Sequence, residues 1–160
     1  MTLTRRHALL LGASAAAATA FATSAQAAEP PVFSAAKSRL SFGGEYAIRG
    51  TDPVGYFTEG RPVDGTEDFT SDWMGATWAF ASAENKALFD ADPEAYAPQY
   101  GGYCAWAVSQ GYTASTVPEA WHIHEGKLYL NFSRGVQRRW LGDVPGNIAN
   151  GDANWPSVLG

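Results

Sequence analysis

The stretch Thr77–Cys104, TWAFASAENKALFDADPEAYAPQYGGYC, decides the fold of this chain. It predicts, in order, an apolar strand, a helix that begins after Ser82, a second short helical segment that begins at Pro93, and a glycine turn. That turn leads directly to Cys104, the only cysteine in the sequence. The remaining elements can be placed before or after this stretch.

Two β-hairpins are predicted, one ending inside this stretch and one following it. Their turns fall at Met74-Gly75 and Glu125-Gly126, each between two apolar, aromatic-containing runs. The strands of the first hairpin are residues 68–73 and 76–81, and those of the second are residues 120–124 and 127–132.

Shorter elements surround the hairpins. Residues 46–48 and 54–57 are apolar runs that predict short strands, separated by a turn at Asp52-Pro53. Ser133 predicts the start of a helix, and residues 144–159 predict an irregular helical tail. Together these patterns indicate an α+β fold, in which a hairpin-plus-helix unit is followed by a second β-hairpin and C-terminal helices.

The first 27 residues have the pattern of an export signal. A short basic start, an alanine-rich apolar run and small residues at Ala25 and Ala27 predict cleavage after Ala27. Arg5 and Arg6 stand directly before the apolar run, which resembles twin-arginine signals; the alternative is an ordinary secretory leader. In both cases we expect a periplasmic or secreted bacterial protein.

The mature chain has the length of one domain and an acidic charge. Residues 28–41 contain Pro30-Pro31 and no sustained period, so we expect a flexible linker before a single domain at residues 42–160. Without the leader the formal charge is about −7, which argues against nucleic acid or an anionic membrane surface as partner. No other stretch is apolar enough to predict stable membrane insertion once the leader is removed.

Three segments resemble the YHS domain, a family akin to the TRASH metal-binding domains. They are residues 51–54 (TDPV), residues 76–82 (ATWAFAS) and residues 85–96 (NKALFDADPEAY). The resemblance covers about residues 47–98 and implies a small treble-clef-like unit of a hairpin and a helix. The continuation through Gly101–Cys104 resembles longer exported proteins that carry this domain.

The sequence departs from the family at the metal-binding positions. Where metal-binding members carry cysteines, this chain has Gly55, Ala81 and the run of residues 83–85. The thiolate cluster is therefore missing, and the resemblance implies the fold more strongly than the metal.

Three other residues could hold a metal ion. His122 and His124 are spaced by two on a predicted strand and share a face, and Cys104 could supply a third ligand for copper or zinc. The alternative is that the histidines are merely solvated and the cysteine is a small core residue. A lone cysteine in an exported protein is buried and inert, bound to a metal, or paired with another chain.

The aromatic content gives a second hypothesis for binding. The chain has six tryptophans and seven tyrosines, and Tyr100, Tyr103 and Trp106 cluster around Cys104. These three residues are candidates for binding a small molecule, the alternative being an ordinary aromatic core.

We therefore expect an exported YHS-like binding protein, with copper or zinc handling as the first hypothesis. The alternative is a metal-free module that binds a small molecule or a protein partner through an aromatic surface. An enzyme comes third, because the sequence has no local signature of a cysteine hydrolase around Cys104.

Overall fold

The computed structural model describes residues 28–36 and 44–160, so the predicted leader lies outside the described residues. The fold is α+β, as expected. The strands are β1 (Ser34–Ala36), β2 (Glu45–Ala47), β3 (Thr66–Trp73), β4 (Ala76–Phe80), β5 (Trp121–His124) and β6 (Lys127–Leu130). The helices are α1 (Gly55–Thr58), α2 (Ala83–Ala91), α3 (Pro93–Tyr96), α4 (Ala105–Ser109), α5 (Arg134–Trp140) and α6 (Val144–Asn154).

The strands form three antiparallel pairs, β1 with β2, β3 with β4 and β5 with β6. Both predicted hairpins are confirmed. Met74 and Gly75 turn the first with φ values of 53° and 76°, and Glu125 and Gly126 turn the second with 50° and 75°. Two successive positive φ values give a turn whose twist matches that of the flanking strands.

The first core forms beneath the β3–β4 hairpin. Trp78 and Phe80, two residues apart on β4, are both fully buried and pack against Phe89 of α2, each with ring centroids 5.1 Å from the Phe89 ring. Helix α2 begins where predicted, because the Ser82 hydroxyl accepts a hydrogen bond from the Asn85 amide at 3.1 Å. The helix therefore holds Phe89 against the strand.

One short element differs from the prediction. Residues 54–57, expected as a strand, lie at the start of helix α1. The reason is the preceding side chain: the Asp52 carboxylate accepts hydrogen bonds from the amides of Val54 and Gly55, which begins a helical turn.

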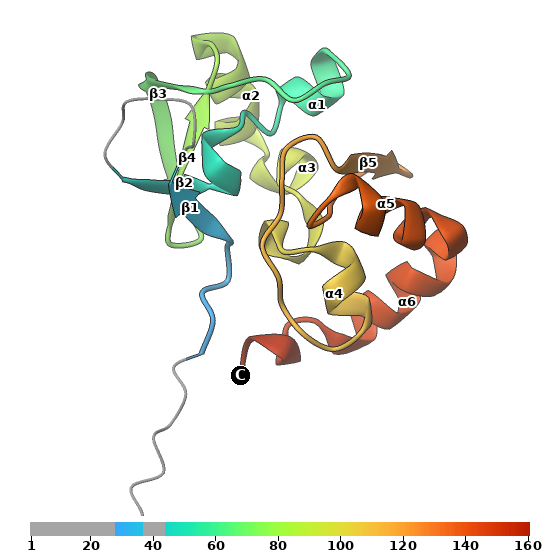
Figure 1. Ribbon diagram of the computed structural model, residues 1–160. Coiled ribbons are helices and arrows are strands. Elements are labelled where there is room, and N and C mark those ends of the chain that lie inside the picture. The colour runs from blue at the N-terminus through green and yellow to red at the C-terminus, as the bar shows by residue number, and fades with distance from the viewer. Residues whose placement is uncertain (1–27, 37–43) are drawn as a thin grey trace, which may run out of the picture.

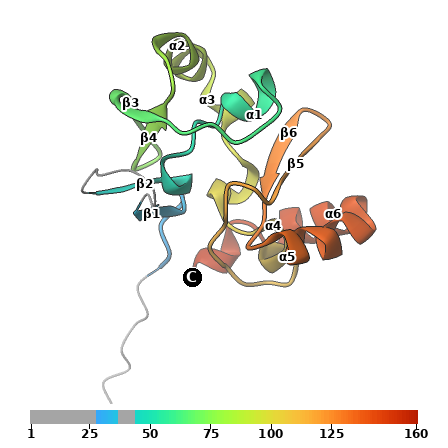
Figure 2. The ribbon, with the colours of Figure 1, turned by 45° about the horizontal axis from the view of Figure 1, so that its top comes forward.

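The β5–β6 hairpin lies between two cores. Leu128 and Leu130 of β6 belong to the first core, whereas Tyr129 between them packs on Trp140 of α5 in the second, with ring centroids 5.0 Å apart. Figures 1 and 2 show the hairpin beside α1 on one side and helices α4 to α6 on the other. Successive side chains of β6 point to opposite faces of the hairpin, so this one strand contributes to both cores.

The first described residues of the chain are docked on the domain. Residues 28–36 fall in the expected flexible linker, but Val32 and Phe33 are buried and β1 pairs with β2. The Phe33 amide donates to the Gly101 carbonyl at 2.9 Å. Gly101 has φ +59°, and a β-carbon there would lie 1.9 Å from the Pro31 carbonyl oxygen, so this docking requires glycine. The rest of the predicted linker, residues 37–41, lies outside the described residues.

Within residues 28–36 and 44–160, no helix has both the length and the apolar character that crossing a membrane requires.

Candidate functional site

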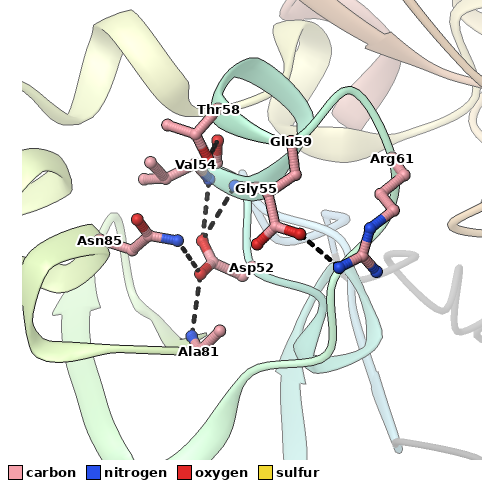
Figure 3. Close-up of polar contacts among 8 residues, drawn as sticks. All are labelled: Asp52, Val54, Gly55, Thr58, Glu59, Arg61, Ala81 and Asn85. Carbon is pink, nitrogen blue, oxygen red and sulfur yellow. Dashed lines mark hydrogen bonds and ion pairs between the residues drawn. The ribbon is translucent and has the colours of Figure 1, made fainter.

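Asp52 is the polar centre of the part of the chain that resembles the YHS domain. Its carboxylate is fully buried. One oxygen accepts from the amides of Val54 at 2.9 Å and Gly55 at 3.4 Å, and the other accepts from the Ala81 amide at 2.8 Å and Asn85 Nδ2 at 2.7 Å. Figure 3 shows these four donors converging from α1, the end of β4 and α2. Asp52 therefore ties the three elements together.

The positions at which the resemblance implies cysteines meet around this carboxylate. Gly55, Ala81 and Asn85 all donate to Asp52, so the fold brings these positions together although the thiols are absent. A β-carbon at residue 55 would lie 2.7 Å from Cγ2 of Val63, which leaves no room for a side chain. Hydrogen bonds hold this centre together, and its residues offer no soft metal ligand.

Cys104 lies in the C-terminal part of the chain, directly before helix α4. Its side chain is 1% exposed, and its Sγ accepts a hydrogen bond from the Phe132 amide at 3.3 Å. The Asn131 side chain is next to it, with Oδ1 3.7 Å from Sγ and 3.2 Å from the Trp106 amide. The cysteine thus lies between the start of α4 and the end of β6.

Burial raises the pKa of the Cys104 thiol, and this effect outweighs hydrogen bonds from the amides of Ala107, Phe132 and Trp106, which lower it. The side chain is therefore a neutral thiol at neutral pH. A neutral thiol is a poor nucleophile and a poor metal ligand.

His122 and His124 share one face of β5, as the sequence predicts. Their rings lie 6.4 Å apart, centroid to centroid, with an interplanar angle of 25°. Trp121 and Ile123 pack on the first core from the opposite face. His122 also contacts Trp140, with ring centroids 5.9 Å apart. Two imidazoles on one face of a strand could serve as two ligands of the same metal ion.

The pKa of His122 is lowered, first by burial and then by His124, so its imidazole is neutral at neutral pH. Among the described residues, however, no three His, Cys, Asp or Glu side chains are grouped so that they could hold one metal ion. The structure therefore brings the two histidines together but does not join Cys104 to them as a third ligand.

The two tyrosines predicted to bind a small molecule are buried in the second core. Tyr100 is 5% exposed, and its hydroxyl donates to Asp152 Oδ1 at 2.9 Å. Tyr103 is 4% exposed, and its hydroxyl donates to the Pro30 carbonyl at 2.9 Å. Burial raises both pKa values, that of Tyr103 to about 12. Both rings and both hydroxyls are thus engaged within the protein.

Trp106, the third of these aromatic residues, is half-buried and lines a cleft that opens above the cysteine. The cleft, here called the Cys104 cleft, has a volume of about 260 Å³. Its lining residues come from α4, from the loop after it, and from the end of β6 and α5: Cys104, Trp106, Ala107, Tyr112, Ala114, Phe132, Val136 and Arg139.

Two exposed aromatic residues that line this cleft were not predicted from the sequence. Tyr112 and Phe132 are each 52% exposed, although both are large aromatic side chains. Phe132 directly precedes Ser133, whose hydroxyl accepts from the Val136 amide at 3.2 Å and so starts α5 beside the cleft. The only signal in the sequence was an apolar residue immediately before a capping serine.

Comparison with known proteins adds one finding. The sequence model of the YHS domain family matches residues 54–100. No curated protein and no solved structure matches the chain significantly.

Proposed function

We propose that the protein is a non-catalytic binding module, in which the YHS domain at residues 54–100 serves as a scaffold. YHS domains are associated with metal sites, but the residues around Asp52 offer no soft metal ligand here. The ligand of the protein is a small molecule with an apolar body, bound in the Cys104 cleft. The pairing of two half-exposed aromatic side chains at one concave site supports this proposal.

Exposing a large aromatic side chain to water is unfavourable in free energy, and a bound ligand would cover that apolar surface. Five large hydrophobic side chains are exposed among the described residues, and the two aromatic ones, Tyr112 and Phe132, flank the same cleft. Concave sites lined by apolar and aromatic side chains are the usual sites for small molecules. Trp106 and Val136 add to the apolar lining of this cleft.

Two larger clefts are less suited to an apolar ligand. A cleft of about 400 Å³ beside Met74 is lined in part by Glu94 and Lys127, and one of about 410 Å³ is lined by Glu125 and Asp152 among others. A charged side chain is stabilised by water or by a partner of opposite charge. An apolar ligand would displace that water without replacing its hydrogen bonds. The Cys104 cleft has one charged lining residue, Arg139.

Titration with the neutral dye N-phenyl-1-naphthylamine tests the proposal. We expect the dye to bind the wild-type protein with a rise in fluorescence, and Phe132→Gln to abolish most of that binding. Met74→Gln is the matched control, because Met74 is 51% exposed and lines the 400 Å³ cleft. Retained binding in Phe132→Gln, or an equal loss in Met74→Gln, would overturn the proposal.

A second readout locates the dye. Cys104 is the only thiol in the chain and lines the Cys104 cleft, so bound dye should slow its reaction with a thiol reagent such as dithiobis(nitrobenzoate). Dye that binds without slowing this reaction is bound elsewhere.

Metal binding is the second candidate function, and the stacked pair His122 and His124 supports it. Copper or zinc would take both imidazoles, with water or an external ligand completing the coordination. Titration with Zn²⁺ and Cu²⁺ should then give one site that His122→Ala with His124→Ala removes and Cys104→Ala leaves intact. No stoichiometric binding to the wild-type protein would overturn this candidate.

Both functions would operate outside the cytoplasm, after removal of a twin-arginine-type leader. Replacing Arg5 and Arg6 by lysine should retain the precursor in the cytoplasm, as cell fractionation would show. Unchanged export would indicate an ordinary secretory leader.

A further inference from the structure

The cationic side chains of this acidic protein are unevenly placed. Helix α5 carries three of the seven lysines and arginines within the described residues, namely Arg134, Arg138 and Arg139. All three are exposed, and α5 contains no acidic residue. The helix therefore places a local positive charge on a protein of net negative charge.

Three of the other cations are engaged within the protein. Arg61 pairs with Glu59, and Lys86 with Asp90. Arg49 donates to the Thr116 carbonyl at 2.8 Å and lies over the Phe33 ring. By contrast, no ion pair or hydrogen bond engages the guanidinium groups of α5 within the described part of the chain.

One of these free cations belongs to the wall of the Cys104 cleft. Arg139 lines it together with Val136, one helical turn earlier, so an apolar and a cationic side chain face the same ligand space. Two aromatic side chains, Trp106 and Phe132, also line the cleft. No acidic side chain lines the cleft.

We propose that the Cys104 cleft selects a small amphiphilic anion, whose ring or short acyl body lies against Trp106, Phe132 and Val136 and whose single acidic group pairs with Arg139. This inference rests on the proposed binding function and names its ligand class. Guanidinium groups bind carboxylates, sulfonates and phosphates through paired donors, so the acidic group can be any of these.

The size of the cleft limits the body of the ligand. Its volume of about 260 Å³ is below the usual range of roughly 300–1,000 Å³ for drug-sized ligands, so one fused ring system or a short chain fills it. The neutral Cys104 thiol beneath adds no second charge. A ligand with one apolar body and one anionic group therefore matches both the apolar lining residues and Arg139.

Two probes of equal shape test this inference: 2-naphthoate, which is anionic, and 2-naphthamide, its neutral isostere. Both would be titrated into isotope-labelled full-length mature protein and followed by NMR at the Trp106 indole and the amides of Phe132 and Val136. We expect naphthoate to bind about fivefold more tightly than naphthamide, with the difference shrinking at high salt.

The variant Arg139→Gln should weaken naphthoate binding about fivefold and leave naphthamide binding unchanged. Arg134→Gln is the matched control, because Arg134 lies on the same helix but does not line the cleft. Equal binding of the two probes to the wild-type protein, or an equal effect of the two arginine variants, would overturn the charge selection.

The outcomes separate this inference from the proposed function. If naphthamide binds at the cleft as tightly as naphthoate, apolar binding stands and anion selection fails. If neither probe shifts the Trp106 signal, the binding function itself fails, and this inference fails with it.

Discussion

The part of the molecule that contains the YHS match, residues 44–100 and here called the YHS part, and the C-terminal part, residues 101–160, differ in charge and in how their polar groups are engaged. The YHS part carries eleven acidic and three basic residues, and its one buried carboxylate, Asp52, is engaged by four donors. The C-terminal part carries four of each and contains the cleft, the histidine pair and the unpaired arginines of α5. The buried carboxylate of the part with the family signature is thus fully partnered, whereas the residues of the proposed binding sites lie in the other part.

This difference teaches that the sites proposed here lie outside the family match. The positions around Asp52 where the resemblance implies metal ligands are filled by backbone amides and an asparagine. Among the described residues, the thiol, the two imidazoles and the exposed large aromatic side chains all occur after residue 100. Four changes would break or sharpen this contrast.

The largest effect is expected for Asp52→Ala. It leaves four donors without their acceptor, and each buried unsatisfied group costs roughly 1–3 kcal/mol. We expect the free energy of unfolding in urea to fall by more than about 3 kcal/mol. The exposed Asp68→Ala is the control, with an expected change below about 0.5 kcal/mol. A small loss for Asp52→Ala would show that this centre is dispensable.

The next effect concerns the second core. In Gly151→Ala the new β-carbon would lie 2.5 Å from the Tyr100 hydroxyl oxygen, which Asp152 and the Ile148 carbonyl hold in place. An overlap cost of roughly 1–3 kcal/mol opposes a gain in helix propensity of about 1 kcal/mol. We expect a net loss near 1 kcal/mol in urea unfolding. Gly142→Ala, with open space around the new carbon, should lose nothing; a stabilised Gly151→Ala would contradict the packing of Tyr100.

Two helix caps offer a matched pair across the two parts. Ser82 caps α2 and Ser133 caps α5 with nearly equal geometry, at 3.1 and 3.2 Å. Ser82→Ala and Ser133→Ala should each cost about 1 kcal/mol of stability. Only Ser133→Ala should also weaken binding of N-phenyl-1-naphthylamine, because α5 forms a wall of the Cys104 cleft. Equal binding losses in the two variants would place the dye outside this cleft.

The smallest effect is a pH dependence. Folding lowers the pKa of His122 below its unfolded value of about 6.5, so the unfolded state binds more protons just below that pH. Stability should therefore be fully present above pH 6.5 and fall as the pH drops below it. Urea unfolding between pH 5.5 and 7.5 would measure this slope, and His122→Gln should flatten it. An unchanged slope would assign the effect to other groups.

The local elements could be predicted from the sequence because their signals are local. Both hairpins follow from paired turn residues, and the helices after Ser82 and Ser133 follow from their capping hydroxyls. The strand predicted at residues 54–57 was wrong because one side-chain contact, from Asp52 two residues earlier, overrode a short apolar run.

The candidate site could be predicted only in part. The shared face of His122 and His124 follows from strand periodicity. The burial of Tyr100 does not, because its hydroxyl partner, Asp152, is 52 residues away in the chain. The cleft combines α4, the loop after it and α5, and no local pattern places Phe132 next to Cys104.

Because successive side chains of β6 pack into different cores, the strand limits where the chain can be cut into separately folding fragments. Leu128 and Leu130 fill the first core, so a fragment that ends with the family match at residue 100 would leave that core open to water. Tyr129, between them, anchors the second core to the same strand. The end of the family match at residue 100 is therefore not a folding boundary. We expect the two parts to unfold in one cooperative transition, and a YHS part transplanted alone to need a replacement for this hairpin.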